Sequence, residues 1–408
     1  MTRPCARLIS IGDELLNGRT VDTNATFLGR RLTDLGLRVQ GVAAVGDGQA
    51  DIEAALRAAC ADADVVLCTG GLGPTDDDRT RDALAAVLGV AQLPDPEAWR
   101  AICRRWAILR PGLEPSPANR RQALVPVGAK TLANDRGTAP GLLVRHGRSW
   151  IVCLPGVPHE MVAMAERLFR RLAKLLPSLP TQRVAEIYLA GVGESAVQEH
   201  LYGLFDGEDP QVGITVSDLG HLVLRVVGSP APVRARAAIL RRRVTPWLLP
   251  GPGLAPSLVA ALAERGLTIT AAESCTVGLV AAALGAVPGA SAVLEEAVVT
   301  YAPSAKRRRL GVTPAVLQQV VSAPCAEAMA RGARRRTGAS IAIATTGYAG
   351  PGGGSSEVPV GTAFVAVADA HGVYSRGLRI DGDRRRVQAR VTAEALLLAW
   401  ERLISQND

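Results

Sequence analysis

The alternation of strand-like and helix-like segments at the start of the chain constrains the fold more than any other feature. Apolar strand-like runs at 6–12, 37–45 and 64–71 alternate with amphipathic helix-like segments at 23–36, 49–62 and 79–89. Crossover helices between such strands give a mostly parallel sheet with helices on both faces. A later buried strand is expected at 150–156, followed by a long amphipathic helix with Pro158 near its start.

The character of the sequence then changes twice, which suggests further domains. From about Gln182 the pattern is strand, helix, strand, turn and strand, as in a small α+β unit. Residues 248–257, LLPGPGLAPS, are rich in Pro and Gly and are expected to form a linker. A third block rich in strand–helix pairs follows. We therefore expect an α/β protein with domains at 1–173, 174–250 and 251–408, a number that suits 408 residues.

Composition places the chain among soluble globular proteins. The hydrophobic fraction is 48% and the charged fraction 21%, and no apolar stretch is long enough to span a membrane. The first residues have no signal-peptide pattern, so a cytoplasmic location is expected. Seven cysteines lie scattered without a CxxC motif, and five histidines are equally dispersed. A disulfide framework or zinc site is therefore not expected, and any metal would be held by carboxylates, which favours magnesium or manganese.

The net charge of +8 raises the question of nucleic-acid binding. Arginine runs occur at 241–243, 307–309, 334–336 and 384–386, but aromatic residues make up only 3% of the chain and no nucleic-acid-binding motif is recognised. The runs fall near expected helices or loops, where they would be solvated. Nucleic acid is therefore an unlikely partner, and anionic small substrates explain the charge equally well.

A glycine-rich loop at 68–80, CTGGLGPTDDDRT, follows a buried strand and opens a helix. Its glycines, Gly70, Gly71 and Gly73, let backbone amides approach a ligand closely, and the helix start favours an anion. Three aspartates at 76–78 would suit a divalent cation bridging to a phosphate. The alternative is a tight turn whose acidic residues simply favour the helix start.

Three segments together resemble the CinA family (competence/damage-inducible protein A): 11–24, IGDELLNGRTVDTN; 69–80, TGGLGPTDDDRT; and 154–161, LPGVPHEM. In that family the first domain resembles the three-layer, molybdopterin-binding fold of MoaB and Mog proteins. The resemblance implies an ADP-ribose diphosphatase dependent on a divalent metal such as Mg²⁺. It makes Asp47 and Asp78 the candidate metal-binding and catalytic residues. The same pocket would be lined by Gly12, Asp13, Glu14, Asp22 and Asn24 together with Gly70, Gly71 and Gly73.

The last domain contains two strand-to-loop transitions of interest, at 268–278, TITAAESCTVG, and at 339–354, ASIAIATTGYAGPGGG. Ser274 and Thr276 suit the N-cap of a helix beginning near Thr276, or a phosphate seat at its N-terminus. The glycine loop that contains Gly347 and Gly350 is expected to contribute to the same cleft. The two strand ends would meet there if the strands are neighbours.

A serine, a tyrosine and a lysine lie around the strand-like segment in 289–306, GASAVLEEAVVTYAPSAK. Taken alone they could be ordinary surface residues. The block resembles the C-terminal CinA domain, which is shared with PncC nicotinamide-nucleotide amidases. The resemblance implies hydrolysis of nicotinamide mononucleotide to nicotinate mononucleotide and ammonia without a metal, with Ser291 as nucleophile and Tyr301 and Lys306 as catalytic partners. A neutral lysine can replace histidine as the base that activates a serine, and Arg384 would bind the substrate.

Four positions depart from the family pattern: Val277, Tyr348, Val358 and Gln388 stand where a glycine, a small aliphatic residue, a lysine and an arginine are usual. These changes bear on phosphate affinity rather than on the chemistry. The family also implies pyridine nucleotides and ADP-ribose as small-molecule partners, and a homodimer. Two rival functions remain open: a non-catalytic interaction protein of competence or DNA damage, and a molybdopterin-binding protein.

Overall fold

The computed structural model describes residues 3–176, 178–217 and 219–405, and these form two compact units. The first unit is Met1–Arg183 and the second is Val184–Asp408. The segment expected to be a separate middle domain belongs to the second unit, where it forms a sheet of its own.

The first unit is built on a six-stranded sheet with the order β2-β1-β3-β8-β7-β6. The strands are β1 (Cys5–Ile11), β2 (Arg38–Val45), β3 (Val65–Thr69), β6 (Lys130–Leu132), β7 (Gly141–His146) and β8 (Ser149–Leu154). The first four in the order are parallel, and β7 and β6 are antiparallel additions. The expected mostly parallel sheet is therefore present.

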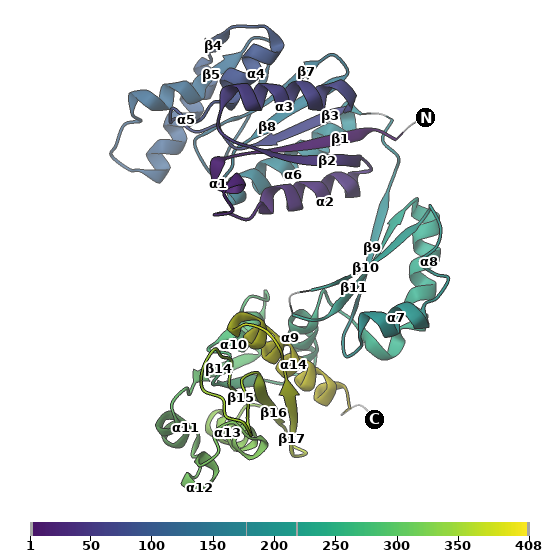
Figure 1. Ribbon diagram of the computed structural model, residues 1–408, viewed down its shortest axis with the longest axis vertical. Coiled ribbons are helices and arrows are strands. Elements are labelled where there is room, and N and C mark those ends of the chain that lie inside the picture. The colour runs from purple at the N-terminus through teal and green to yellow at the C-terminus, as the bar shows by residue number, and fades with distance from the viewer. Residues whose placement is uncertain (1–2, 177, 218, 406–408) are drawn as a thin grey trace. The chain divides into compact units, whose positions relative to one another are not determined.

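Helices cover both faces of this sheet (Figure 1). Apolar side chains of α2 (Thr23–Leu35) and α6 (Pro158–Leu175) share one core with the sheet, and those of α3 (Gln49–Asp62) and α4 (Thr80–Leu88) share the other. The remaining elements are α1 (Asp13–Leu16), α5 (Pro96–Leu109), the 3₁₀ helix η1 (Pro117–Ala123), and the strand pair β4 (Gln92–Pro94) and β5 (Leu124–Pro126). These layers give the three-layer arrangement expected for this part of the chain.

The second unit begins with a four-stranded sheet in the order β10-β11-β9-β12. Its elements are β9 (Arg183–Leu189), α7 (Glu194–His200), β10 (Gln211–Val216), β11 (Leu222–Gly228), α8 (Pro230–Arg243), the 3₁₀ helix η2 (Thr245–Trp247) and β12 (Leu248–Leu249). Alternate residues of β11 and apolar residues of both helices form one core. The expected linker at 248–257 is not a free linker, because it supplies β12 and the start of the next helix.

The rest of the second unit is a five-stranded sheet in the order β14-β13-β15-β16-β17. The strands are β13 (Ile269–Glu273), β14 (Leu294–Val299), β15 (Ile341–Gly347), β16 (Thr362–Ala368) and β17 (Val373–Arg379). One core joins the sheet to α9 (Leu254–Glu264), α10 (Leu279–Gly285) and α14 (Arg384–Ile404), and the other joins it to α11 (Pro303–Leu310), α12 (Pro314–Leu317) and α13 (Ala323–Thr337). Strand β13 is parallel to both of its neighbours, so the carboxyl ends of β14, β13 and β15 meet at one edge.

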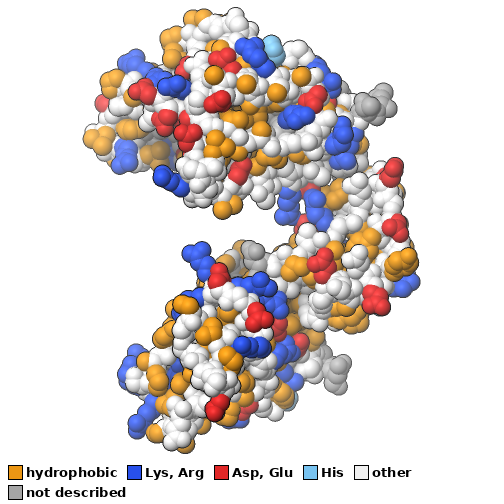
Figure 2. All heavy atoms as spheres, viewed as in Figure 1, with side chains coloured by type: hydrophobic (Ala, Val, Ile, Leu, Met, Phe, Trp, Pro, Cys, Tyr) orange, Lys and Arg blue, Asp and Glu red, His pale blue; other side chains and the backbone are white. Residues whose placement is uncertain are grey.

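Three of the four arginine runs lie in the last turns of α8, α11 and α13, where cations interact favourably with the helix dipole. On the face shown in Figure 2, basic and acidic side chains are interspersed in both units. The fourth run, 384–386, lies in the first turn of α14, where the dipole disfavours cations. Its position therefore needs another explanation. Within the described residues, no helix has both the length and the apolar character needed to cross a bilayer.

Candidate active site

Lys306 is the most unusual side chain of the second unit, because a long amine is almost fully buried. Only 1% of the residue is exposed. Its Nζ lies 2.8 Å from Ser274 Oγ, and it also donates to the backbone carbonyls of Thr300 and Tyr301 at 2.8 Å each. Ser274 directly follows β13, and Lys306 lies on α11, which follows β14. The parallel pairing of β13 with β14 therefore brings the two residues to one sheet edge.

The environment of Lys306 favours a neutral amine. Burial lowers the pKa of Lys306 below its ordinary value, and only the nearby Cys325 and Cys275 oppose this effect. Among the described residues, no carboxylate forms an ion pair with it. A buried lysine without a counter-ion can accept a proton from an adjacent hydroxyl, which is what a general base must do.

The serine is better placed than the neighbouring cysteine to be activated by the lysine. Burial raises the pKa of the Cys275 thiol to about 12, so this thiol stays protonated and unreactive near neutral pH. The Ser274 hydroxyl is hydrogen-bonded to Lys306 Nζ, and the Ser274 backbone N–H donates to Thr345 Oγ1 at 3.3 Å. Ser274 and Lys306 together form a nucleophile and base pair.

Glu273 fixes the turn that carries Ser274. Its buried carboxylate accepts hydrogen bonds from Thr276 Oγ1 at 2.6 Å and from the backbone N–H groups of Gly278, Val280 and Ala281 at 2.8–3.2 Å. The carboxylate thus satisfies N–H groups at the start of α10, which begins at Leu279 and not near Thr276 as the sequence had suggested. These donors fully occupy the Glu273 carboxylate.

Ser291 does not take part in this site, which corrects its assignment as the nucleophile. It is exposed and lies in the 3₁₀ helix η3 (Ala290–Ala292), before β14 begins. Lys306 follows the other end of β14. A six-residue strand spans about 20 Å, so Ser291 and Lys306 lie toward opposite ends of β14. The structure brings Ser274 to Lys306 instead.

Tyr301 and Arg384 form the outer part of the site. The Tyr301 side chain is 56% exposed, and its hydroxyl accepts a hydrogen bond from Arg384 Nη2 at 3.2 Å. Only the backbone carbonyl of Tyr301 hydrogen-bonds to Lys306, and the phenol forms no hydrogen bond with Ser274 or Lys306 in the described structure. Arg384 also donates to the Gly350 carbonyl at 2.9 Å. This rim contact gives a role to an arginine in the first turn of α14, where the helix dipole disfavours it.

Gly347 and the side chain of Thr276, two other predicted features of this region, make structural contacts. A Cβ on Gly347 would come within 2.6 Å of the Cβ of Ala363 on β16, so close packing between strands requires this glycine. The Thr276 hydroxyl lies 2.8 Å from Thr345 Oγ1 and is fully buried, which ties the turn to β15. Neither contact supports the substrate-binding role expected for Gly347 and Thr276.

Val277 has a strained backbone within the Ser274 turn. Its φ is +51°, and it is the only residue other than glycine with positive φ in the part of the chain that the structure describes. This conformation is rare for a β-branched residue and costs on the order of 1–3 kcal/mol. Its side chain is 48% exposed and offers little packing in return. The departure to valine noted at this position therefore has a stability cost.

We expect Val277→Gly to raise the free energy of unfolding of the second unit by about 1 kcal/mol, because relieved strain outweighs the extra entropy of an unfolded glycine. Thermal and denaturant unfolding of the full chain measures this. Val299→Gly is the matched control, since Val299 is 49% exposed but lies in a regular strand, where the same change should destabilise. Equal destabilisation by both changes would show that Val277 carries no strain.

The first unit contains a second candidate site at the carboxyl ends of its parallel strands. A cleft there is lined by Gly12, Glu14, Asp47, Asp78 and the glycine loop. Its volume of about 570 Å³ is within the range of small-molecule sites. Asp22 and Asn24 line an adjoining pocket that shares Glu14 and other residues with this cleft. Asp22 also caps α2 by accepting from Ala25 N–H at 2.8 Å.

The glycine loop turns its carbonyl groups away from the cleft. Thr80 binds the carbonyls of Gly70 and Gly71, through Oγ1 at 2.8 Å and through its backbone N–H at 3.1 Å. The buried Arg81 guanidinium donates to the carbonyls of Leu72 and Gly73 at 2.8 and 2.6 Å. Because a trans peptide directs its N–H opposite to its C=O, the N–H groups of Gly71 and Leu72 face the other way. Both N–H groups lack a protein acceptor within the described ranges, as in an anion-binding nest.

No pattern in the sequence singles out Arg81, although its charge is central to this loop. Burial lowers the pKa of Arg81 to about 10, with Asp78 and Asp82 acting in the opposite direction, and the group stays cationic at neutral pH. A buried cation behind two free N–H groups favours an anionic ligand. Recognising it from sequence would require knowing that the helix after the loop turns this residue inward.

The two predicted metal-binding aspartates have different environments. Asp78 accepts from the N–H groups of Gly73 and Thr75 at 2.7 and 2.9 Å, so its carboxylate holds the loop together. Asp47 accepts from the Asp13 N–H at 3.0 Å. Burial raises the pKa of the Asp47 carboxyl, and nearby carboxylates add to the effect. Within the described part of the chain, no three His, Cys, Asp or Glu side chains are grouped to hold a metal ion, so the residues do not fit a ready-made metal site.

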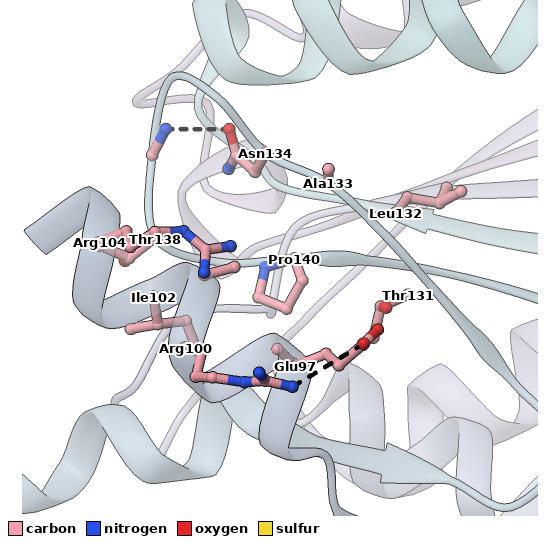
Figure 3. Close-up of a pocket in the computed structure, with 13 residues that line it drawn as sticks. Glu97, Arg100, Ile102, Arg104, Thr131, Leu132, Ala133, Asn134, Thr138 and Pro140 are labelled. Atoms are coloured by element: carbon pink, nitrogen blue, oxygen red, sulfur yellow. Dashed lines mark hydrogen bonds and ion pairs between the residues drawn. The ribbon is translucent and has the colours of Figure 1, made fainter.

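A further pocket lies between α5 and residues 131–140 (Figure 3). Figure 3 shows Arg100 and Arg104 extending from the helix across it, with the Arg100 guanidinium 3.8 Å from Glu97. Thr138 lines both this pocket and the Asp47 cleft. None of the residues predicted to be functional lines it, and its mixed charges do not select a ligand.

Comparison with known proteins matches two parts of the chain to two family models. A family model described as the CinA C-terminal domain matches residues 253–403, and one described as a probable molybdopterin binding domain matches residues 7–174. The chain is 39% identical over 416 residues to a CinA-like protein of Chlorobium luteolum, covering 97% of this chain and 96% of the relative. It is 40% identical to a CinA-like protein of an Anaeromyxobacter species, covering 96% and 97%.

Solved structures match parts of the chain. The CinA protein of unknown function from Thermoplasma acidophilum is 35% identical with a TM-score of 0.40, covering 42% of this chain and 98% of that one. A competence/damage inducible protein from Agrobacterium tumefaciens is 40% identical with a TM-score of 0.36, covering 38% and 94%. Because the similarity to the full-length relatives extends over nearly the whole of both chains, this chain belongs to the CinA family, with a MoaB/Mog-like first domain and a CinA-type C-terminal domain.

Proposed function

We propose that the protein hydrolyses the amide of nicotinamide mononucleotide to give nicotinate mononucleotide and ammonia. The observation that carries this proposal is the 2.8 Å contact between Ser274 Oγ and the buried Lys306 Nζ. A serine activated by a neutral lysine is a nucleophile for acyl transfer and needs no metal. Arg384 at the rim supplies a cation for an anionic substrate. The family resemblance is the reason for choosing a nucleotide amide as that substrate.

The pair supports a two-step reaction. Ser274 Oγ attacks the amide carbon while its proton passes to Lys306 Nζ, and the new C–O bond gives a tetrahedral intermediate. When the C–N bond breaks, the Lys306 ammonium protonates the leaving nitrogen, so ammonia departs and an ester to Ser274 remains. Water then attacks the ester with Lys306 again as base. Cleavage of the ester C–O bond returns the proton from Lys306 to Ser274 Oγ and releases the carboxylic acid, which loses its remaining proton to water and becomes the carboxylate.

The experiment that tests this proposal is ammonia release from nicotinamide mononucleotide by the full chain in the presence of EDTA. Stoichiometric formation of ammonia and nicotinate mononucleotide is expected, and chelation should have no effect because no step uses a metal. A well-folded protein that releases no ammonia would refute the proposed reaction. The interaction-protein hypothesis would then be favoured.

A second candidate function, cleavage of the diphosphate of ADP-ribose, is proposed for the first unit. The observation that favours it is the pair of free N–H groups of Gly71 and Leu72, backed by the buried Arg81. This arrangement suits an oxyanion such as a phosphate. A divalent cation, if used, would be held partly by the substrate, because the protein carboxylates do not form a site of their own.

We expect Asp47→Asn to lower AMP formation from ADP-ribose and Mg²⁺ at least about 10²-fold, because a carboxylate in the cleft supplies base or cation-binding capacity that an amide lacks. EDTA should abolish the reaction in the wild type. Asp51→Asn is the control, since Asp51 is exposed on α3 outside the cleft. If Asp47→Asn matches the wild type, Asp47 has no part in the reaction, and if the wild type forms no AMP, the cleft only binds its ligand.

A further inference from the structure

Two buried backbone N–H groups directly after Ser274 have no acceptor. Cys275 is 3% exposed and Thr276 is fully buried, and neither N–H donates a hydrogen bond to another residue that the structure describes. A buried N–H without an acceptor destabilises the fold, so such groups are rare and require an explanation. A ligand oxygen that binds between them is one such explanation.

The neighbouring carbonyl groups show which way these N–H groups point. The Ser274 carbonyl accepts from Val277 N–H at 3.3 Å inside the turn. The Cys275 carbonyl accepts from Gln388 Nε2 at 2.8 Å, on the side of α14. Each carbonyl shares a trans peptide plane with the next N–H, which points in the opposite direction. The Cys275 N–H therefore points away from the interior of the turn, and the Thr276 N–H points away from α14.

We propose that the N–H groups of Cys275 and Thr276 form the oxyanion hole of the Ser274 site, and that Gln388 is the positioning residue that orients it. This inference rests on the proposed amidase function. Two N–H donors next to the nucleophile stabilise the negative oxygen of the tetrahedral intermediate. Gln388 acts through the peptide group that joins Cys275 to Thr276. Its side-chain amide holds the Cys275 carbonyl in place, and this fixes the direction of the Thr276 N–H in the same peptide plane.

The placement of Gln388 on α14 supports this role. It follows Arg384 by one helical turn, so both residues lie on the face of α14 that meets the active site. A glutamine amide donates to the Cys275 carbonyl as a neutral group. The departure from arginine at this position is thus compatible with catalysis.

The test compares Gln388→Met, which keeps the size but removes the donor, with Gln388→Arg, which restores a donor. Steady-state ammonia release from nicotinamide mononucleotide gives kcat, KM and their pH dependence for the full chain. For Gln388→Met we expect kcat to fall about tenfold to a hundredfold, somewhat less than for loss of an oxyanion-hole donor itself. KM and the midpoint of the pH profile should stay unchanged, and Gln388→Arg should recover part of kcat. Gln318→Met is the control, because Gln318 is exposed and distant from α14 in the sequence.

Each outcome separates this inference from the proposed function. An active wild type with a Gln388→Met variant of equal kcat would overturn the role of Gln388. A shifted pH midpoint would also overturn it, because Gln388 would then act through Lys306. If the Gln388→Met variant does not fold, Gln388→Arg is compared with Gln388→Ala instead, using samples of equal thermal stability. The inference then requires a higher kcat for Gln388→Arg than for Gln388→Ala. A wild type without ammonia release would refute the amidase itself, and the oxyanion hole with it.

Discussion

Replacing Ser274 with alanine is expected to lower kcat for ammonia release by about 10⁴-fold or more, as found when a nucleophile of a catalytic set is removed. The physical reason is that Lys306 then has no hydroxyl to deprotonate, since Ser274 Oγ is its only side-chain hydrogen-bond partner in the described structure. Binding of the nucleotide should be retained, because Arg384 and Tyr301 at the rim are unchanged. Ammonia release and ligand binding, measured on the same samples, check both expectations.

Ser291→Ala is the matched control for this change. Ser291 is exposed in η3, and a surface substitution of this kind changes stability by no more than about 0.5 kcal/mol. Activity should therefore equal that of the wild type. Loss of activity in Ser291→Ala together with an active Ser274→Ala would show that the sequence-based assignment, and not the geometry, identifies the nucleophile.

Lys306→Arg is expected to reduce kcat by about 10²- to 10⁴-fold, the contribution of a general base. An arginine has a similar reach but stays protonated, so it cannot accept the proton of Ser274. Lys306→Met tests the same point without a charge. In the wild type, kcat/KM should rise with pH as Lys306 loses its proton, with a midpoint below 10.5 because burial lowers this pKa. Arg307→Met, on the exposed side of α11, is the control.

The pH profile distinguishes a base from a structural residue. If Lys306→Arg kept wild-type kcat, or if the activity of the wild type fell as the amine became neutral, Lys306 could not be the base. Thermal unfolding of both variants shows whether the fold survives. A folded but inactive Lys306→Arg is the result that the account requires.

Much of the fold could be predicted from the sequence, because strand–helix alternation and glycine-edged strand ends are local patterns. The parallel sheet of the first unit follows from them directly. The segment at 248–257 was interpreted as a linker because Pro and Gly disfavour regular structure, yet it pairs with β9 through β12. That pairing depends on a strand far back in the sequence, which local composition does not reveal.

The candidate site was predicted in part. Lys306 and Arg384, which the sequence patterns select, lie at this site, whereas Ser291, the predicted nucleophile, is near Lys306 in sequence but before the intervening strand. The direction of that strand separates them, and parallel pairing with β13 brings in Ser274 instead. A sequence signal was available: Ser274 follows a buried strand, and Lys306 lies just after another. Carboxyl ends of neighbouring parallel strands meet at one edge.

The contacts that set the chemistry could not be predicted. Asp78 was expected to bind metal, but its carboxylate holds Gly73 and Thr75. Arg81 and Gln388 were not recognised as residues that orient peptide groups, because such roles depend on which carbonyl lies opposite each side chain. Patterns in the sequence indicate where a loop lies, but not which of its N–H groups remain free.

The most direct test of the central claim is to map the covalent intermediate on the wild-type protein. The reaction with nicotinamide mononucleotide would be quenched with acid during turnover and the peptides analysed by mass spectrometry, with hydroxylamine added in parallel to trap the acyl group. The account predicts an ester on the peptide that contains Ser274, at that residue, and a hydroxamate product in the presence of hydroxylamine. An ester at Ser291 or a thioester at Cys275 would contradict it, as would ammonia release without any acylated peptide or hydroxamate.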